Sequence, residues 1–170
     1  LYERSGVRPT LEINGIAGGY YGPGFKTVLP AKAMAKISCR LVSDQEPLRI
    51  VELVRDYIEQ ITPPTVRSDL VFMEHGAKAI LLDQKSTAMQ AAAVAYEKGW
   101  GKKPIFERAG GSIPITYTFQ DVCDEIVIMG FTYKGGRAHG PNENIITDMF
   151  YKGIDAAIQF HYEYAKLFQK

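Results

Sequence analysis

Alternating apolar and polar positions in the first quarter of the chain predict two strands. Residues 10–16 (TLEINGI) alternate with a period of two, and so do residues 33–42 (AMAKISCRLV), with Val28 and Leu29 ahead of them. In the second segment the apolar face consists of Ala35, Ile37, Cys39 and Leu41, and the polar face consists of Lys36, Ser38 and Arg40. A loop rich in glycine joins the two segments, so an antiparallel pair is expected.

Residues 47–61 change to the helical period. Their apolar residues recur at spacings of three and four: Ile50, Val51, Val54, Tyr57, Ile58 and Ile61. Pro47 suits a first turn, Ser43 or Asp44 can cap it, and a Pro-Pro pair ends it. Residues 66–73 are predicted to form a further strand. The first part therefore has the order β-β-α-β, which indicates an α+β layer.

The second half predicts alternating helices and strands. Ser86 caps a helix of small residues that runs through Tyr96 to an end at Gly99. Short strands are expected at residues 105–108 and 125–131, and helices at 114–122 and 143–168. This order indicates part of an α/β layer. We therefore expect two domains, residues 1–82 and 83–170.

Composition narrows the class of protein more than it suggests an activity. The 170 residues are 46% apolar and 23% charged, with a net charge of +1. The charge balance gives no support to a nucleic-acid partner, and the longest apolar runs are too short for a membrane span. Cys39 and Cys123 are far apart and lack zinc-site spacing, which predicts two buried thiols in a reducing cytoplasm.

Two loops could carry chemistry. Gly110, Gly111 and Ser112 lie between a predicted strand and a helix opened by Pro114, where backbone N–H groups attract a carboxylate or phosphate. An ordinary β-α turn would look the same. His139 follows the apolar segment 125–131, and ligands bind at the carboxyl ends of such strands. It is a candidate metal ligand or acid-base group, or else a solvated loop residue.

Three further residues have both a functional and a plain interpretation. Arg40, on the polar face of its strand, could grip a substrate carboxylate in bidentate fashion or simply face solvent. His75 follows a predicted strand, with no other sign of a site. His161 shares a helix face with apolar residues and is expected to be packed in or near the core.

The chain resembles a family of dizinc metallopeptidases and deacylases. The resemblance rests on TLEINGIAGGYYGPGFKTVLPAKAMAKISCRLVSDQEP, then RAGGSIPI, then HGPNENI, in that order and spacing over nearly all of residues 9–168. The family includes carboxypeptidase G, aminoacylase and succinyl-diaminopimelate desuccinylase. The carnosinase-like dipeptidases are the most similar branch.

The resemblance implies a fold and a set of roles. Residues 1–82 resemble a partial ferredoxin-like α+β lid that also dimerises, and residues 83–170 resemble the C-terminal part of an α/β zinc-peptidase catalytic domain. His139 matches the last metal ligand of a site for two zinc ions. Arg40, Gly110, Gly111 and Ser112 match groups that meet the substrate carboxylate, and His75 and Thr27 match lid residues that face the substrate.

The resemblance also implies what lies outside this sequence. The family's other metal ligands and its Glu-Glu pair, which supplies the general base, have no counterpart here, and the first residue is Leu1. We therefore expect the C-terminal fragment of a zinc-dependent hydrolase acting on dipeptides or N-acyl amino acids, inactive and metal-free by itself. The alternative is a stand-alone dimerisation or anion-binding module without catalysis.

Overall fold

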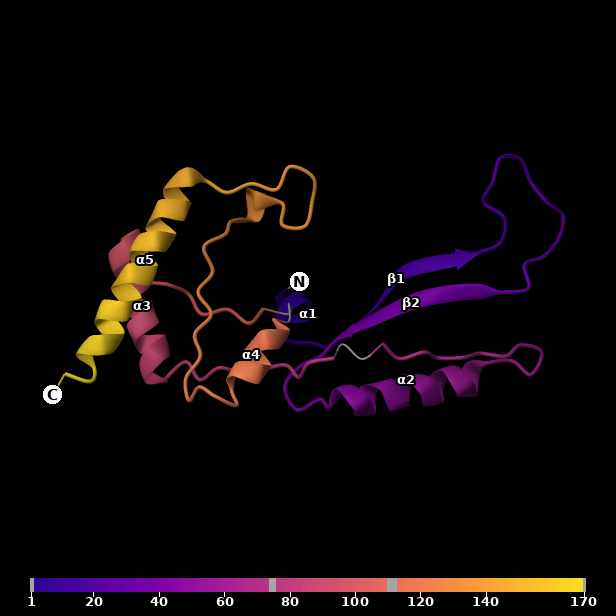
Figure 1. Ribbon diagram of the computed structural model, residues 1–170, viewed down its shortest axis with the longest axis horizontal. Helices are drawn as coiled ribbons and strands as arrows, with labels where there is room; N and C mark the ends of the chain where they lie inside the picture. The colour runs from indigo at the N-terminus through magenta and orange to yellow at the C-terminus, as the bar shows by residue number, and fades with distance from the viewer. Residues whose placement is uncertain (1, 74–75, 110–112, 170) are drawn as a thin grey trace. The chain divides into compact units, whose positions relative to one another are not determined.

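The computed structural model describes residues 2–73, 76–109 and 113–169 (Figure 1). Its elements, in chain order, are α1 (Tyr2–Gly6), β1 (Thr10–Gly18), β2 (Ala33–Arg40), α2 (Pro47–Ile61), α3 (Thr87–Trp100), α4 (Pro114–Phe119), the 3₁₀ turn η1 (Lys134–Gly136) and α5 (Thr147–Lys166). The chain divides into two compact units. One comprises the described residues of Leu1–Ile80 and Arg108–Pro114, and the other those of Leu81–Glu107 and Ile115–Lys170.

The predicted antiparallel pair is confirmed. β1 and β2 form a two-stranded sheet in which Thr10 lies opposite Arg40 and Glu12 opposite Ser38. A bulge between Ile13 and Gly15 shifts the register by one residue. Directly paired residues share a face, so Arg40 lies on the polar face with Glu12.

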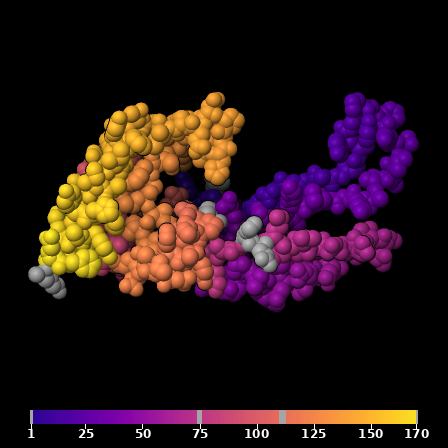
Figure 2. Space-filling view, in the orientation of Figure 1, coloured from indigo at the N-terminus to yellow at the C-terminus, as the bar shows by residue number. Residues whose placement is uncertain are grey.

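The loop joining β1 to β2 extends well beyond the strands (Figure 2, indigo to purple). Several of its apolar side chains face solvent, among them Tyr21, Phe25 and Leu29, the first of which is 96% exposed. Gly19 and Gly24 have φ near +77° and +78°, a backbone conformation that a side chain disfavours. Thr27 lies exposed in this loop.

Helix α2 is confirmed, but its expected cap is wrong. The N-cap position is Glu46, without a side-chain hydrogen bond, and Asp44 takes a left-handed turn at φ 68°. Pro47 occupies the first turn, where its missing N–H leaves no partner unsatisfied. At the other end the Thr62 hydroxyl donates to the Ile58 carbonyl at 2.6 Å. An ion pair between Lys78 and Glu46 brings the later chain back to the start of α2.

The three further strands expected at residues 66–73, 105–108 and 125–131 are wrong, since the described residues hold no strand besides β1 and β2. Their composition suits strands, but a strand forms only where a neighbour accepts and donates backbone hydrogen bonds. Within the described residues, none of these segments joins a ladder of backbone hydrogen bonds with a neighbouring strand. An α/β layer with a covered sheet is therefore absent from the described part of residues 83–170.

The second unit has its core between α3 and α5. The buried apolar residues of the described chain all come from these two helices: Ala88, Met89, Ala91, Ala92, Ala95 and Ala156. Ser86 caps α3 as predicted, accepting from the Met89 N–H at 3.3 Å. The helix runs past Gly99 to Gly101, whose φ of 73° ends it. Gly99 stays helical and admits α5, because a Cβ there would lie 2.8 Å from the backbone nitrogen of Ala156.

The buried face of α5 differs from the apolar stripe of Phe150, Ile154 and Ile158, which lies on the same side as His161 and which the sequence predicts to be buried. Gly153 and Ala156 are buried, whereas Phe150, Ile154 and Ile158 are exposed by 43–50%. His161, expected in or near the core, is exposed beside the Phe160 ring. Small residues allow close helix approach, so the helices meet along their smallest side chains instead of along the large apolar stripe.

The two cysteines are free thiols, but they are not both buried. Cys39 is half-buried and Cys123 is exposed. Burial and the nearby Glu12 carboxylate raise the pKa of the Cys39 thiol. Among the helices of the described residues, none combines the length and the apolar character that a bilayer crossing requires.

Candidate functional site

The candidate site is the loop of residues 132–146, which carries His139 and leads into α5. The segment before it is held at its start by Glu125. This carboxylate accepts from the Thr87 and Ala88 N–H groups at 2.7 and 3.1 Å, and from the Tyr164 hydroxyl at 3.1 Å. Glu125 therefore satisfies two of the open N–H groups of α3 and links that helix to α5.

The end of the same segment has a second anchor. The Tyr96 hydroxyl donates to the Gly130 carbonyl at 2.6 Å, and burial raises the pKa of Tyr96. The Phe131 ring lies 5.4 Å from the Tyr96 ring and stacks on Trp100 at 6.3 Å. Gly153 leaves room for Phe131, since a Cβ there would lie 2.9 Å from the ring. The backbone just before the loop is therefore held in place by the Tyr96 hydrogen bond and by the packing of Phe131.

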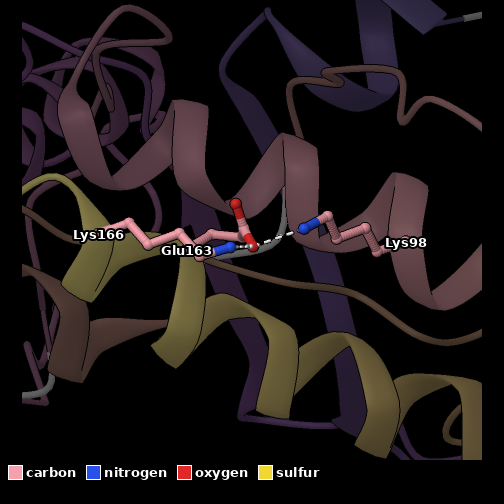
Figure 3. Close-up of polar contacts among 3 residues, drawn as sticks. All are labelled: Lys98, Glu163 and Lys166. Atoms are coloured by element: carbon pink, nitrogen blue, oxygen red, sulfur yellow. Dashed lines mark hydrogen bonds and ion pairs between the residues drawn. The ribbon is translucent and has the colours of Figure 1, made fainter.

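Helices α3 and α5, which frame this entry, are tied by a shared carboxylate. Glu163 accepts from Lys98 on α3 and from Lys166 on α5, each at 2.7 Å (Figure 3). Hydrogen bonds from Lys166 and then Lys98 hold the pKa of Glu163 below its usual value. The triad contributes modestly because the lysines are 44% and 58% exposed.

The loop itself is tightly turned. Arg137, His139 and Asn142 all have left-handed backbones, with φ between 53° and 63°. The Gly140 N–H donates to the Arg137 carbonyl at 2.8 Å, and the Asn144 N–H donates to the Gly136 carbonyl at 2.9 Å. His139 is exposed at the turn, where its imidazole is open to a ligand.

A zinc ion needs three or four protein ligands. No cluster of three His, Cys, Asp or Glu side chains occurs within residues 2–73, 76–109 and 113–169. His139 fits the role of one ligand, because an imidazole exposed on a tightly turned loop is accessible to a zinc ion. The described residues do not supply the remaining ligands.

The other predicted site residues are placed as follows. Arg40 ends β2 and is exposed opposite Thr10, and Thr27 lies exposed in the preceding loop. Both belong to the first unit, whereas His139 belongs to the second. His75, Gly110, Gly111 and Ser112 lie outside the described residues.

Sequence reasoning missed the residues that organise the His139 loop. Glu125 lies 38 positions from the N–H group of Thr87, so no local pattern marks it as a cap. Tyr133 and Asn144 flank the Gly-rich turn, and only the density of glycine and asparagine there signalled a built loop.

Comparisons with known proteins identify the relatives of this chain. Residues 3–66 match the peptidase dimerisation domain of the M20 peptidases. The chain is 31% identical over 162 residues to the Cys-Gly metallodipeptidase dug1 of Schizosaccharomyces pombe, covering 94% of this chain and 34% of that protein. It is 29% identical over 164 residues to the human Beta-Ala-His dipeptidase, covering 94% and 32%.

Solved structures of similar proteins lead to the same family of peptidases. Human carnosine dipeptidase 1 matches with a TM-score of 0.81 and 27% identity, over 97% of this chain and 35% of that one. An M20 family metallo-carboxypeptidase from Sulfolobus solfataricus matches with a TM-score of 0.79 and 27% identity, over 95% and 37%. The resemblance to M20 metallopeptidases and carnosinase-like dipeptidases is confirmed. The chain spans about a third of the length of the curated relatives it matches. Residues 3–66 therefore match an M20 peptidase dimerisation domain, and over nearly all its length the chain is similar to about one third of the length of known metallodipeptidases.

Proposed function

We propose that this chain forms the lid and the last metal-ligand loop of a metal-dependent dipeptidase. The observation that carries the proposal is the turned loop with His139 exposed directly before α5, in a chain that matches a dipeptidase structure over 97% of its length. The lid is a partial ferredoxin-like layer, and residues 83–170 belong to the catalytic part.

His139 would hold one of two zinc ions, together with ligands from outside this chain. When bound, zinc polarises the scissile carbonyl and lowers the pKa of a water. The chain's own residues bind and orient the substrate. The planar Arg40 guanidinium pairs with the free carboxylate of a dipeptide or N-acyl amino acid, and Gly110, Gly111 and Ser112 add donors to it. Thr27 and His75 face the substrate from the lid.

The proposal includes assembly through the lid. Residues 3–66 match a dimerisation domain, and none of the described residues of the first unit is buried, which leaves a large apolar area for a second copy to cover. Light scattering should give a homodimer at micromolar concentration. A strict monomer would contradict this part of the proposal.

The match of residues 3–66 to a dimerisation domain also favours a second candidate function, a dimerisation module without catalysis. The two are separated by a hybrid in which this chain replaces the matching third of the S. pombe Cys-Gly metallodipeptidase. The dipeptidase proposal predicts hydrolysis of dipeptides by the hybrid and none by the 170-residue chain alone, which should also bind no stoichiometric zinc. A folded but inactive hybrid would favour the module.

Arg40 gives the sharper test of substrate class. In the hybrid, Arg40→Ala should reduce stabilisation of the transition state for dipeptide hydrolysis by roughly 1.5–3 kcal/mol, measured as a fall in kcat/KM. Arg40→Lys should restore only part of it, because ammonium lacks the planar fork. Dipeptide amides, which lack the carboxylate, serve as the matched control and should lose little. Equal losses on both substrates would contradict the carboxylate role.

A further inference from the structure

The Tyr133 ring lies across the glycine turn at the base of the His139 loop. A Cβ at Gly135 would collide with the Tyr133 ring, and one at Gly136 would lie 3.6 Å from it. Gly136 is buried, and a Cβ there would also meet the Asn144 carbonyl oxygen at 3.0 Å. The two glycines therefore let the ring fold over its own turn toward the opposite side of the loop.

Across the loop the ring reaches Asn144. The Tyr133 hydroxyl donates to Asn144 Oδ1 at 2.5 Å, and Asn144 Nδ2 donates to the Asn142 carbonyl at 2.9 Å. The Asn144 backbone N–H donates to the Gly136 carbonyl at 2.9 Å. Asn144 thus connects the two sides of the loop through its side chain and its backbone.

These contacts enclose the stretch that holds His139. Between residues 136 and 144, Arg137, His139 and Asn142 keep left-handed backbones, which cost Arg and His free energy, whereas Asn tolerates them. Inside this stretch one backbone hydrogen bond closes a single turn, from the Gly140 N–H to the Arg137 carbonyl. The geometry of His139 therefore depends on closure at the base of the loop.

We propose that Tyr133 and Asn144 form a latch that fixes the backbone of the His139 loop, which makes both of them positioning residues for the metal ligand. This inference rests on the proposed function. A ligand whose supporting loop is preorganised loses less conformational freedom when it binds a metal. The latch acts on His139 through the backbone and touches neither metal nor substrate.

The first test uses the 170-residue chain and amide hydrogen exchange measured by NMR. Tyr133→Phe removes only the hydroxyl, and Tyr162→Phe is the matched control, because Tyr162 is 63% exposed on α5. Tyr133→Phe should lower protection of the Gly140 and Asn144 amides about three- to tenfold. The control should change neither. Unchanged protection in Tyr133→Phe would overturn the latch.

Two further variants separate the latch from simple loss of a polar group. Gly135→Ala keeps every polar group but pushes the ring away, so it should lower protection as Tyr133→Phe does. In an Asn144→Ala background, Tyr133→Phe should have no further effect, since its partner is gone. If the losses of amide protection in the two single variants add up in the double variant, the two residues act separately. That result would overturn the proposal that they form one latch.

The second test follows the metal in the hybrid enzyme loaded with Co²⁺. Tyr133→Phe should speed cobalt release to a chelator about three- to tenfold without changing stoichiometry, whereas His139→Ala should lose one ion. If His139→Ala keeps both ions, the proposed function fails and the positioning role with it. If His139→Ala loses an ion but Tyr133→Phe leaves release unchanged, the latch alone is wrong.

Discussion

The α3–α5 pair and the β1–β2 sheet differ in how much of their apolar surface they cover. The two helices bury six apolar residues against each other, with Ala95 and Ala156 fully inaccessible. On the sheet, Leu11, Ile13 and Ile37 are exposed by 56%, 59% and 41%. Small residues let two helices form a core by themselves, whereas a two-stranded sheet needs another layer over its apolar face.

The largest expected effect tests the helix pair. Ala156→Leu places a large side chain where Gly99 and Ala156 already touch, so the free energy of unfolding should fall by roughly 1–3 kcal/mol. Its neighbour Ala157 is exposed, so Ala157→Leu should change stability little. Urea unfolding of both variants measures the difference. Equal effects would mean that α5 does not meet α3 along this face.

The next effect tests the link between the helices and the His139 segment. Glu125→Ala removes the acceptor for two backbone N–H groups and for the Tyr164 hydroxyl, which should cost about 1–2 kcal/mol. Asp124→Ala is the control, because it removes a neighbouring negative charge without touching these bonds. Thermal unfolding compares the two. A harmless Glu125→Ala would contradict the anchor.

Acid should weaken the helix pair through Glu163. Its pKa is lowered in the folded chain, so its stabilising contribution is complete above the ordinary glutamate pKa of about 4.3 and is lost as pH falls through the folded value. Comparing Glu163→Gln with the unmodified chain between about pH 7 and pH 2 isolates this carboxylate. The stability difference should shrink toward the acid end. A constant difference would exclude the charge as its source.

The smallest effect tests the sheet. Ile13→Ala on the apolar face should change the stability of a monomer by less than about 0.5 kcal/mol, because that side chain is already in water. A loss above about 1 kcal/mol that grows with protein concentration would show that a second copy covers the face, as the dimerisation proposal requires.

Local patterns predicted the elements that local forces determine. The alternation at residues 10–16 and 33–42, the helical stripe of 47–61 and the Ser86 cap all describe interactions within a few residues. The strands expected at 66–73 and 125–131 depend on neighbours that sequence alone does not provide. The apolar stripe of α5 misled for a similar reason, because Gly153 and Ala156 decided which face packs.

For the candidate site, the motif predicted His139 but not its support. The HGPNENI pattern marked the loop, whereas the Tyr133–Asn144 hydrogen bond spans 11 positions and the Glu125 bonds span up to 39. Contacts between residues so far apart in the sequence depend on the path that the chain takes between α3 and α5. Thr27, Arg40, His75, Gly110, Gly111 and Ser112 keep their predicted roles as proposals that the hybrid can test.

The most direct test of the account is the metal content of the hybrid with and without His139. Elemental analysis of the folded, purified protein should find two zinc ions per chain in the hybrid and one in His139→Ala, with dipeptide hydrolysis largely lost. Tyr162→Phe should retain both ions. A folded His139→Ala hybrid that still binds two zinc ions and hydrolyses dipeptides would contradict the central claim that this loop carries a metal ligand.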